Sequence, residues 1–236
     1  MGKADLHIHT TFSDGSSSVQ EVIRKAISLK LDTIAITDHN EIEGAIRAKE
    51  LVQKWGLPLD VVVGEEITTS DGHVVGLFLK ERIRPLLTAE ATVDEIHRQG
   101  GLAVAVHPFS LWLKIFKCGG VGRLVENMQF DAIESINGSP LEGFSNTYTK
   151  AFNRKIKLSA VAGSDAHTAE AIGQGYTVFP GKGSTMLYSA IRNKAVYAKN
   201  GKSAAKALVD FIIKYLRGKM AIYGEKGGAL DQVAAN

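Results

Sequence analysis

The sequence predicts an α/β barrel, and three observations support this prediction. Short apolar runs typical of buried strands alternate with amphipathic segments of helical period along most of the chain. Most helical segments lie between two strand-like runs, as expected when right-handed crossovers join neighbouring parallel strands. Histidines and acids recur at or just after the ends of the apolar runs, where a barrel gathers its functional groups. Together these patterns predict one barrel lined by about seven strands.

The first half of the chain is expected to contain four strands and two helices. The strands occupy 4–10, 32–37, 59–68 and 73–79, and the helices occupy 18–30 and 42–55. Ser17 or Ser18 can cap the first helix, and Gly56 and Pro58 end the second. A Ser-Asp-Gly turn at 70–72 makes the fourth strand the hairpin partner of the third.

The second half continues the same alternation. Strands are expected at 102–106, 131–136, 158–162 and 176–179, and helices at 92–99, 141–154 and 184–193. Thr92 is expected to cap the first of these helices, which ends at Gly100 and Gly101. The longest irregular connection, at 110–122, has the character of a substrate loop at a strand end.

The chain divides into a barrel and a shorter C-terminal part. The barrel is expected to occupy residues 1–200. Within 201–236, an amphipathic helix at 203–216 is expected to dock on the barrel, and the Gly-rich tail after it to fray.

Composition narrows the class of protein. The 236 residues are 44% hydrophobic and 22% charged, which is ordinary for a globular protein with a sizeable core. The net charge of +3 suits an anionic substrate and is far from that of a dedicated nucleic-acid binder. The single cysteine, Cys118, excludes an internal disulfide and suits a reducing compartment. No apolar leader or membrane-length segment is visible, so we expect a cytoplasmic protein without a membrane partner.

A His-x-His pair lies on the first expected strand. His7 and His9 are two residues apart, so their side chains face the same side of a strand. Two imidazoles preceded by Asp5 are costly to bury without a common purpose, which favours metal ligation over a structural role. Asp14 follows in a short loop, where it is either a ligand or a turn residue.

Polar side chains also end the second and third expected strands. Only one of Asp38 and His39 can point into a site from a regular strand, and we favour His39 as the ligand and Asp38 as an orienter or structural partner. The alternative is that residues 38–40 merely open the next loop. Glu65 and Glu66 face opposite sides of the third strand, and their spacing leaves open which one enters a site. A carboxylate that bridges two cations is neutralised by them, which explains how a barrel tolerates it.

The remaining histidines have different surroundings. His73 begins the hairpin strand, and His107 ends the strand that comes next in the chain. Asp165 and His167 repeat the two-residue spacing of the first pair after a later strand. His97 lies within a helix among polar residues, and we expect it at the surface.

Seven short motifs occur in a fixed order over roughly residues 3–200: D-L-H-I-H-T, F-S-D-G, I-T-D-H, G-E-E-I-T, G-H, V-H-P and G-S-D-A-H. In this set the chain resembles the PHP (polymerase and histidinol phosphatase) family of metal-dependent phosphoesterases. The resemblance implies a distorted seven-stranded (β/α)7 TIM-like barrel with a trinuclear metal site at the carboxyl ends of the strands. An acid at position 14, where other members carry histidine, resembles the branch that includes nucleoside mono- and bisphosphate phosphatases.

The resemblance also implies which residues hold each ion. One ion would bind His7, His9, Glu66 and Asp165; a second would bind Glu66, His73 and His107; a third would bind Asp14, His39 and His167. Glu66, which matches the family pattern better than Glu65, would bridge two ions. The cofactors would be two or three divalent ions, and the hard oxygen ligand at position 14 favours manganese or iron over zinc. Such ions would bind a phosphate and activate water for direct attack, with Glu66, Asp14, His39 and His167 as the catalytic residues.

Substrate recognition has weaker signals. Lys114, Lys117 and Arg123, in or beside the 110–122 segment, could contact a second phosphate, and the alternative is a solvated basic loop. Trp112 and Phe116 in the same segment could stack on a base, with packing against the barrel as the alternative. Asn137, at the end of an expected strand, could line the substrate pocket.

We expect an enzyme that hydrolyses a phosphomonoester, with a nucleotide or a nucleoside 3′,5′-bisphosphate as its substrate. The main alternative is a 5′-3′ exonuclease that acts on short RNA or DNA. An amidohydrolase also begins with His-x-His on a first barrel strand, but it usually needs a ligating lysine and a different late pattern. A non-catalytic, metal-stabilised accessory domain is disfavoured because every motif position is filled.

Overall fold

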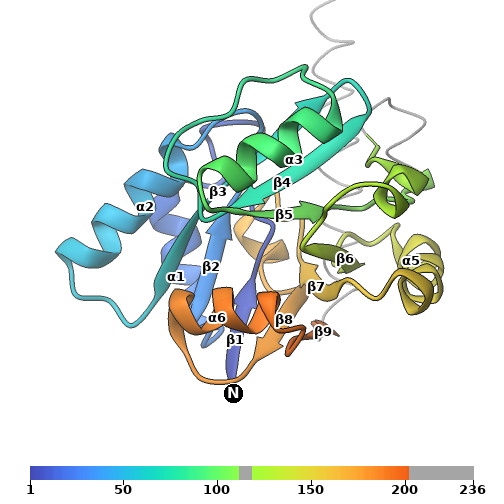
Figure 1. The fold of residues 1–236 in the computed structure, drawn as a ribbon. Helices are drawn as coiled ribbons and strands as arrows, with labels where there is room; N and C mark the ends of the chain where they lie inside the picture. The colour runs from blue at the N-terminus through green and yellow to red at the C-terminus, as the bar shows by residue number, and fades with distance from the viewer. Residues whose placement is uncertain (112–118, 202–236) are drawn as a thin grey trace, which may run out of the picture.

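The computed structural model describes residues 1–111 and 119–201, which form an α/β fold around a nearly closed, barrel-shaped sheet (Figure 1). The strands are β1 (Gly2–Asp5), β2 (Thr33–Ile36), β3 (Asp60–Thr69), β4 (Gly72–Leu77), β5 (Leu102–Ala105), β6 (Ala132–Asn137), β7 (Ser159–Gly163), β8 (Gly175–Phe179) and β9 (Tyr197–Asn200). The helices are α1 (Val19–Ser28), α2 (Glu43–Lys54), α3 (Ala89–Arg98), α5 (Gly143–Ile156) and α6 (Gly183–Arg192), with 3-10 turns η1 (Gly122–Glu126) and η2 (Ala169–Ala171). The predicted α/β barrel character is confirmed.

The sheet of the described residues has nine strands, in the order β7-β6-β5-β4-β3-β2-β1-β8-β9. Eight of them were located from the sequence, of which about seven were expected to line the barrel. Strands β1 to β3 are mutually parallel, as are β5 to β7, and β4 lies antiparallel between these two sets. β8 pairs antiparallel with β1 and with β9. The sequence missed β9 because that strand is largely exposed and lacks the apolar run of a buried strand.

The two ends of the sheet meet between β7 and β8. The hydroxyl of Thr177 accepts a hydrogen bond from the Ala162 amide at 2.8 Å and donates to the Ala162 carbonyl at 3.0 Å. Beyond the strand ends, Ile8 pairs in parallel with Ala166, and the His9 amide donates to the Ala166 carbonyl at 2.9 Å. This second contact sets the His-x-His pair beside the late Asp-x-His pair.

Helices α1, α2, α3 and α5 pack against the outer face of the sheet (Figure 1). Ser18 caps α1, and its side chain and backbone exchange hydrogen bonds with Glu21 in a capping box. Ser18 is one of the two serines that were expected to cap this helix. The cap predicted at Thr92 for α3 was wrong, because Thr88 caps this helix by accepting from the Ala91 amide. Thr92 lies one turn into the helix, where its hydroxyl donates to the Thr88 carbonyl. Both Thr88 and Thr92 are residues that can cap a helix, so local sequence does not distinguish them. The cap is Thr88 because the helix starts at Ala89.

Apolar side chains form two clusters. One lies between the sheet and the helices α1, α2, α3 and α5, and the other joins side chains of the strands to Leu187, Ala190 and Ile191 of α6. No helix of the described residues is both long and apolar enough to cross a bilayer. The expectations for Trp112, Lys114, Phe116, Lys117 and the helix at 203–216 fall outside the described residues.

Candidate metal centre

Nine histidines and acids come together at one end of the barrel. In each of four overlapping groups of these residues, the possible ligand atoms lie within 4.8 Å of one another. The nine are His7, His9, Asp14, His39, Glu66, His73, His107, Asp165 and His167. They are the nine residues expected to hold metal ions from the sequence, and they come from six separate segments of the chain.

Glu66, at the end of β3, lies at the centre of the cluster. Its Oε1 is 2.8 Å from His73 Nδ1 and 2.9 Å from His107 Nε2. Its Oε2 is 3.2 Å from the Nε2 atoms of both His7 and His9. The two oxygens of one buried carboxylate therefore face two separate sets of imidazoles, which is the arrangement of a bridging ligand.

Asp165 adds a second, largely buried carboxylate beside the His-x-His pair. Its Oδ1 lies 3.3 Å from His9 Nε2 and 3.6 Å from His7 Nε2. The parallel pairing of Ile8 with Ala166 produces these distances, because it aligns the two motifs residue for residue. The same nitrogens that face Glu66 thus also face Asp165.

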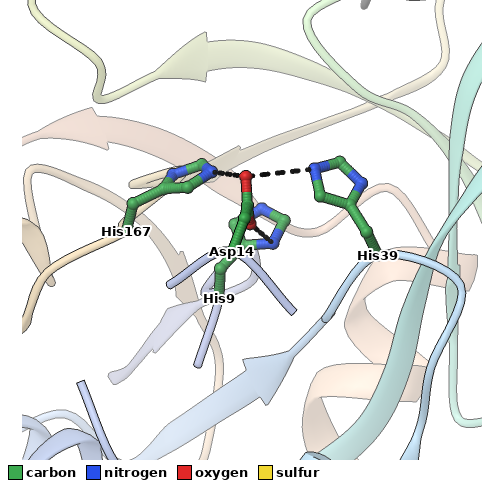
Figure 2. A group of neighbouring side chains, drawn as sticks. All are labelled: His9, Asp14, His39 and His167. Carbon is green, nitrogen blue, oxygen red and sulfur yellow. Dashed lines mark hydrogen bonds and ion pairs between the residues drawn. The ribbon is translucent and has the colours of Figure 1, made fainter. Parts of the chain in front are cut away.

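Asp14 and two histidines form the open end of the cluster, as Figure 2 shows. Asp14 Oδ2 lies 3.0 Å from His167 Nε2 and 3.8 Å from His39 Nε2, and Asp14 Oδ1 lies 3.7 Å from His9 Nδ1. The side chain of Asp14 is 54% exposed, whereas that of Glu66 is 1% exposed. The Asp14 end is therefore the part of the cluster that is exposed to solvent.

The structure distinguishes between the two adjacent glutamates. Glu65 is buried on the opposite face of β3, where its Oε2 accepts a hydrogen bond from the Ile83 amide at 2.8 Å. Burial raises the pKa of Glu65 to about 7. Only Glu66 enters the cluster. The spacing on the strand left open which glutamate would do so, and the structure decides it, because the Glu66 face of β3 is turned toward the cluster.

Asp38 supports the loop that carries Asp14. It accepts hydrogen bonds from the Thr10 amide and hydroxyl and from the Ser13 hydroxyl, each at 2.7 Å. Asp38 was expected to be an orienter or a structural partner, and its contacts are those of a structural partner that supports the loop between His9 and Asp14.

The charges of the cluster are strongly coupled. Burial alone would lower the pKa of His9, but the carboxylates of Asp165 and Glu66 raise it to about 9. Burial alone would raise the pKa of Glu66, but the nearby imidazoles of His39, His7 and His73 hold it well below its usual range. The carboxylates thus remain ionised although they are buried.

Two residues of the cluster have strained backbones. His107 has φ of 28° and Asp165 has φ of 53°, in the left-handed region that side-chain-bearing residues seldom occupy. Strain of this kind persists where the surrounding structure holds a functional group in place.

The donor set suits a divalent cation. Both ring nitrogens of His9 and the Nδ1 of His107 are buried without a hydrogen-bond partner among the described residues. His9 Nε2 nevertheless lies within ion-pair distance of two carboxylates. Imidazole nitrogens and carboxylate oxygens at these separations fit the ligation of a common ion, and this donor set is one that manganese, iron and zinc accept.

A cavity of about 760 Å³ adjoins the cluster at His73. Its lining includes Arg123 and the aromatic residues Phe109, Phe144 and Tyr148. The sequence predicted a substrate contact for Arg123, which is exposed and pairs with Glu126 at 2.7 Å, but not for the three aromatic residues. Helical spacing on α5 places 144 and 148 on one face, and no other sequence signal linked them to the cluster.

Two further residues, Asn137 and His97, were singled out from the sequence. The side chain of Asn137 is buried and hydrogen-bonded to neighbouring residues, so its predicted substrate contact stays a prediction. His97 is partly buried on α3, where its Nε2 lies 2.8 Å from Asp131 Oδ2, and it takes no part in the cluster.

Sequence reasoning missed one acid that contacts the cluster. Glu134, in β6, is buried with its Oε1 3.0 Å from His7 Nδ1. The signal that could have found it is a carboxylate inside an otherwise apolar strand, since such a group needs partners when it is buried.

Comparisons with known proteins agree with this geometry. Residues 5–223 match the PHP domain. The uncharacterized protein MJ1587 of Methanocaldococcus jannaschii is 36% identical over 166 residues, which cover 66% of this chain and 92% of that protein. The 5′-3′ exoribonuclease Rnm of Escherichia coli is 38% identical over 77 residues, which cover 31% of this chain and 26% of that protein.

Several solved structures have a similar fold. One of them is a two-domain protein from Bacteroides vulgatus that contains a predicted PHP-like metal-dependent phosphoesterase, with a TM-score of 0.68 and 20% sequence identity. The match covers 84% of this chain, and this chain spans 64% of the length of that protein. At this identity the likeness shows a shared fold.

Proposed function

The chain belongs to the PHP domain family of metal-dependent phosphoesterases, and from this premise we propose that it hydrolyses a phosphomonoester. The substrate class that we propose is a nucleotide or a nucleoside bisphosphate. The observation that carries the proposal is Glu66, whose two carboxylate oxygens each face a different set of imidazoles. A buried carboxylate in this position suits a centre of two or three divalent ions.

The chain supplies the ligands and the path of entry. His7, His9, Glu66 and Asp165 form the buried floor, and Asp14, His39 and His167 form the exposed rim. Divalent ions held there would bind the phosphate oxygens and activate a water molecule for direct attack. The excess positive charge of such ions over the three carboxylates favours a phosphate dianion at the rim.

The cavity beside His73 suits the remainder of the substrate. Its volume of about 760 Å³ lies in the range of small-molecule sites. Phe144 and Tyr148 offer exposed aromatic rings for stacking, and Arg123 offers a cation for a second phosphate. These groups favour an aromatic, multiply charged substrate such as a nucleotide.

A second candidate function is 5′-3′ exonuclease activity on short RNA or DNA. The similarity to the exoribonuclease Rnm supports it, although the shared segment is short. The aromatic cavity would then hold a terminal nucleotide of a longer strand.

One experiment separates the two candidates. Purified protein is loaded with manganese, iron or zinc and incubated with nucleoside mono- and bisphosphates and, in parallel, with end-labelled oligonucleotides. We expect inorganic phosphate from the mononucleotides. Release of mononucleotides from the oligonucleotides, without free phosphate, would establish the exonuclease instead.

The two adjacent glutamates provide a matched pair of variants. We expect Glu66→Gln to lower turnover by at least about a hundredfold, because the amide cannot supply two anionic oxygens to two ions. Glu65→Gln changes an equally buried neighbour on the other face of β3 and is expected to leave turnover nearly unchanged. Equal activity of the two variants would reject the bridging role of Glu66.

A further inference from the structure

An irregularity in β6 brings two polar side chains to the same face of the sheet. Glu134 pairs with Val161 of β7, but Ile136 pairs with Ala162 and Asn137 with Gly163, so Ser135 is an extra residue in the ladder. Residues three apart on a regular strand face opposite sides. The bulge at Ser135 removes this difference and places Glu134 and Asn137 on one face.

The carboxylate of Glu134 contacts two candidate metal ligands. Its Oε1 accepts from His7 Nδ1 at 3.0 Å, and its Oε2 accepts from the backbone amide of His107 at 2.9 Å. Gly163 leaves the space that these contacts need, since a Cβ there would lie 2.3 Å from the Cβ of His7 and 3.0 Å from Glu134 Oε1. With Nδ1 engaged, the Nε2 of His7 faces Glu66 at 3.2 Å.

The amide of Asn137 extends the contacts to a third ligand. Its Nδ2 donates to Glu134 Oε2 at 3.0 Å and to Asp165 Oδ2 at 3.1 Å, and its Oδ1 accepts from the Ser139 amide. The acceptor role of Oδ1 fixes the orientation of the amide, so that its two hydrogens lie between two carboxylates. Asp165 is left with Oδ1 toward His7 and His9.

We propose that Glu134 and Asn137, brought together by the bulge in β6, are positioning residues that orient His7, His107 and Asp165 for metal binding. Glu134 holds the proton of His7 on Nδ1, so that the lone pair of Nε2 points into the cluster. Asn137 ties one oxygen of Asp165 and leaves the other for an ion. Contacts of this kind orient ligands and raise their basicity, and their loss commonly weakens metal binding 10- to 100-fold. The inference rests on the metal centre of the proposed function.

The substitution Glu134→Gln tests the tautomer directly. The carboxylate accepts from three donors, and an amide group replaces one accepting oxygen with a donor. If the amide oxygen serves the His107 amide and Asn137, the new NH2 group faces His7 Nδ1 and requires it to accept. The His7 proton then moves to Nε2, the atom that the ion needs.

The experiment measures zinc binding rather than turnover. Circular dichroism first shows which variants are folded, and competition with a chelator then gives the zinc affinity, with elemental analysis for the number of ions bound. We expect Glu134→Gln to weaken at least one ion 10- to 100-fold and Asn137→Ala to weaken one by about tenfold. Glu65→Gln, a buried glutamate outside the cluster, serves as the matched control and should stay within about twofold of the wild type. In the zinc-loaded wild type, the 15N shifts of His7 should show a protonated Nδ1.

The outcomes distinguish this inference from the proposed function. If the wild type binds zinc and the folded Glu134→Gln and Asn137→Ala variants bind it equally well, the positioning role is wrong and the metal centre stands. If the wild type binds no divalent ion, both the metal centre and the inference fail. Should Glu134→Gln not fold, Asn137→Ala and the His7 shifts of the wild type decide the question.

Discussion

At the scale of single residues, the surroundings of a side chain decide its chemistry more than its type does. Glu65 and Glu66 are adjacent and identical, yet burial raises the pKa of Glu65, while the imidazoles of five histidines lie within 3.4 Å of the Glu66 carboxylate. Burial would raise the pKa of Glu66 too, but the histidines outweigh it and lower that pKa. Glu66 is therefore suited to hold cations, whereas Glu65 is a buried acid outside the cluster.

The raised pKa of Glu65 makes stability depend on pH. The folded-state pKa of about 7 lies above the unfolded value of 4.5, so the folded protein binds the Glu65 proton more tightly. The resulting stability is complete below pH 4.5 and is lost as the pH rises through 7. A shift of this size corresponds to at most about 3 kcal/mol.

Glu65→Gln should remove this dependence, since the amide resembles the neutral acid. We expect urea unfolding to give similar stabilities for the variant and the wild type near pH 5, and a more stable variant near pH 8. Stability curves that stay parallel over this range would contradict the assignment.

At the scale of elements, the close packing of β6, β7 and the segment after β1 sets the geometry of the cluster. Gly163 ends β7 directly against His7, and the ideal Cβ position there is 2.3 Å from the Cβ of His7. No side chain fits without movement of the histidine. The requirement for glycine at this strand end is therefore steric.

Gly163→Ala should displace His7 and destabilise the protein by about 1–3 kcal/mol. It should also weaken metal binding, because His7 is one of the candidate ligands. Gly143→Ala is the control: it lies in the first turn of α5, where a Cβ meets no atom within 4 Å, and it should be neutral or slightly stabilising. Chemical denaturation of both variants checks the difference. Equal stability of the two would show that His7 adapts without cost.

At the scale of the whole molecule, closure of the barrel brings the first and last motifs into contact. The parallel pairing of Ile8 with Ala166 joins segments about 160 residues apart, and Asp14 meets His167 across the same seam. A cation bound to both sides would hold this seam together. Metal binding and the stability of the barrel should therefore be linked.

Removal of metal ions should lower the melting temperature. An ion present at a hundred times its Kd contributes about 2.7 kcal/mol, which for a chain of this size corresponds to roughly 5–10 °C. Thermal unfolding in chelator, and after titration with manganese or zinc, measures the shift. Glu66→Gln should show a smaller shift than the wild type, and a melting temperature that is independent of metal in the wild type would contradict the linkage.

Much of the architecture was predictable because it depends on local patterns. Apolar runs and capping residues placed most strands and helices near their observed bounds, and the turn at 70–72 correctly predicted the hairpin of β3 and β4. The capping residue of α3 and the exposed strand β9 were not predictable, since Thr88 and Thr92 carry the same signal and β9 has no apolar run.

The sequence by itself determined which side chains could form the cluster, because histidines and acids at strand ends are brought to one end of any parallel barrel. Only the tertiary structure decided how they are used: that Glu66 turns inward and Glu65 does not, that Asp38 supports a loop, and that Glu134 contacts His7. These outcomes depend on strand register, on one bulge in β6 and on the seam between Ile8 and Ala166. They are set by contacts between segments far apart in the chain, which the local pattern of residues does not contain.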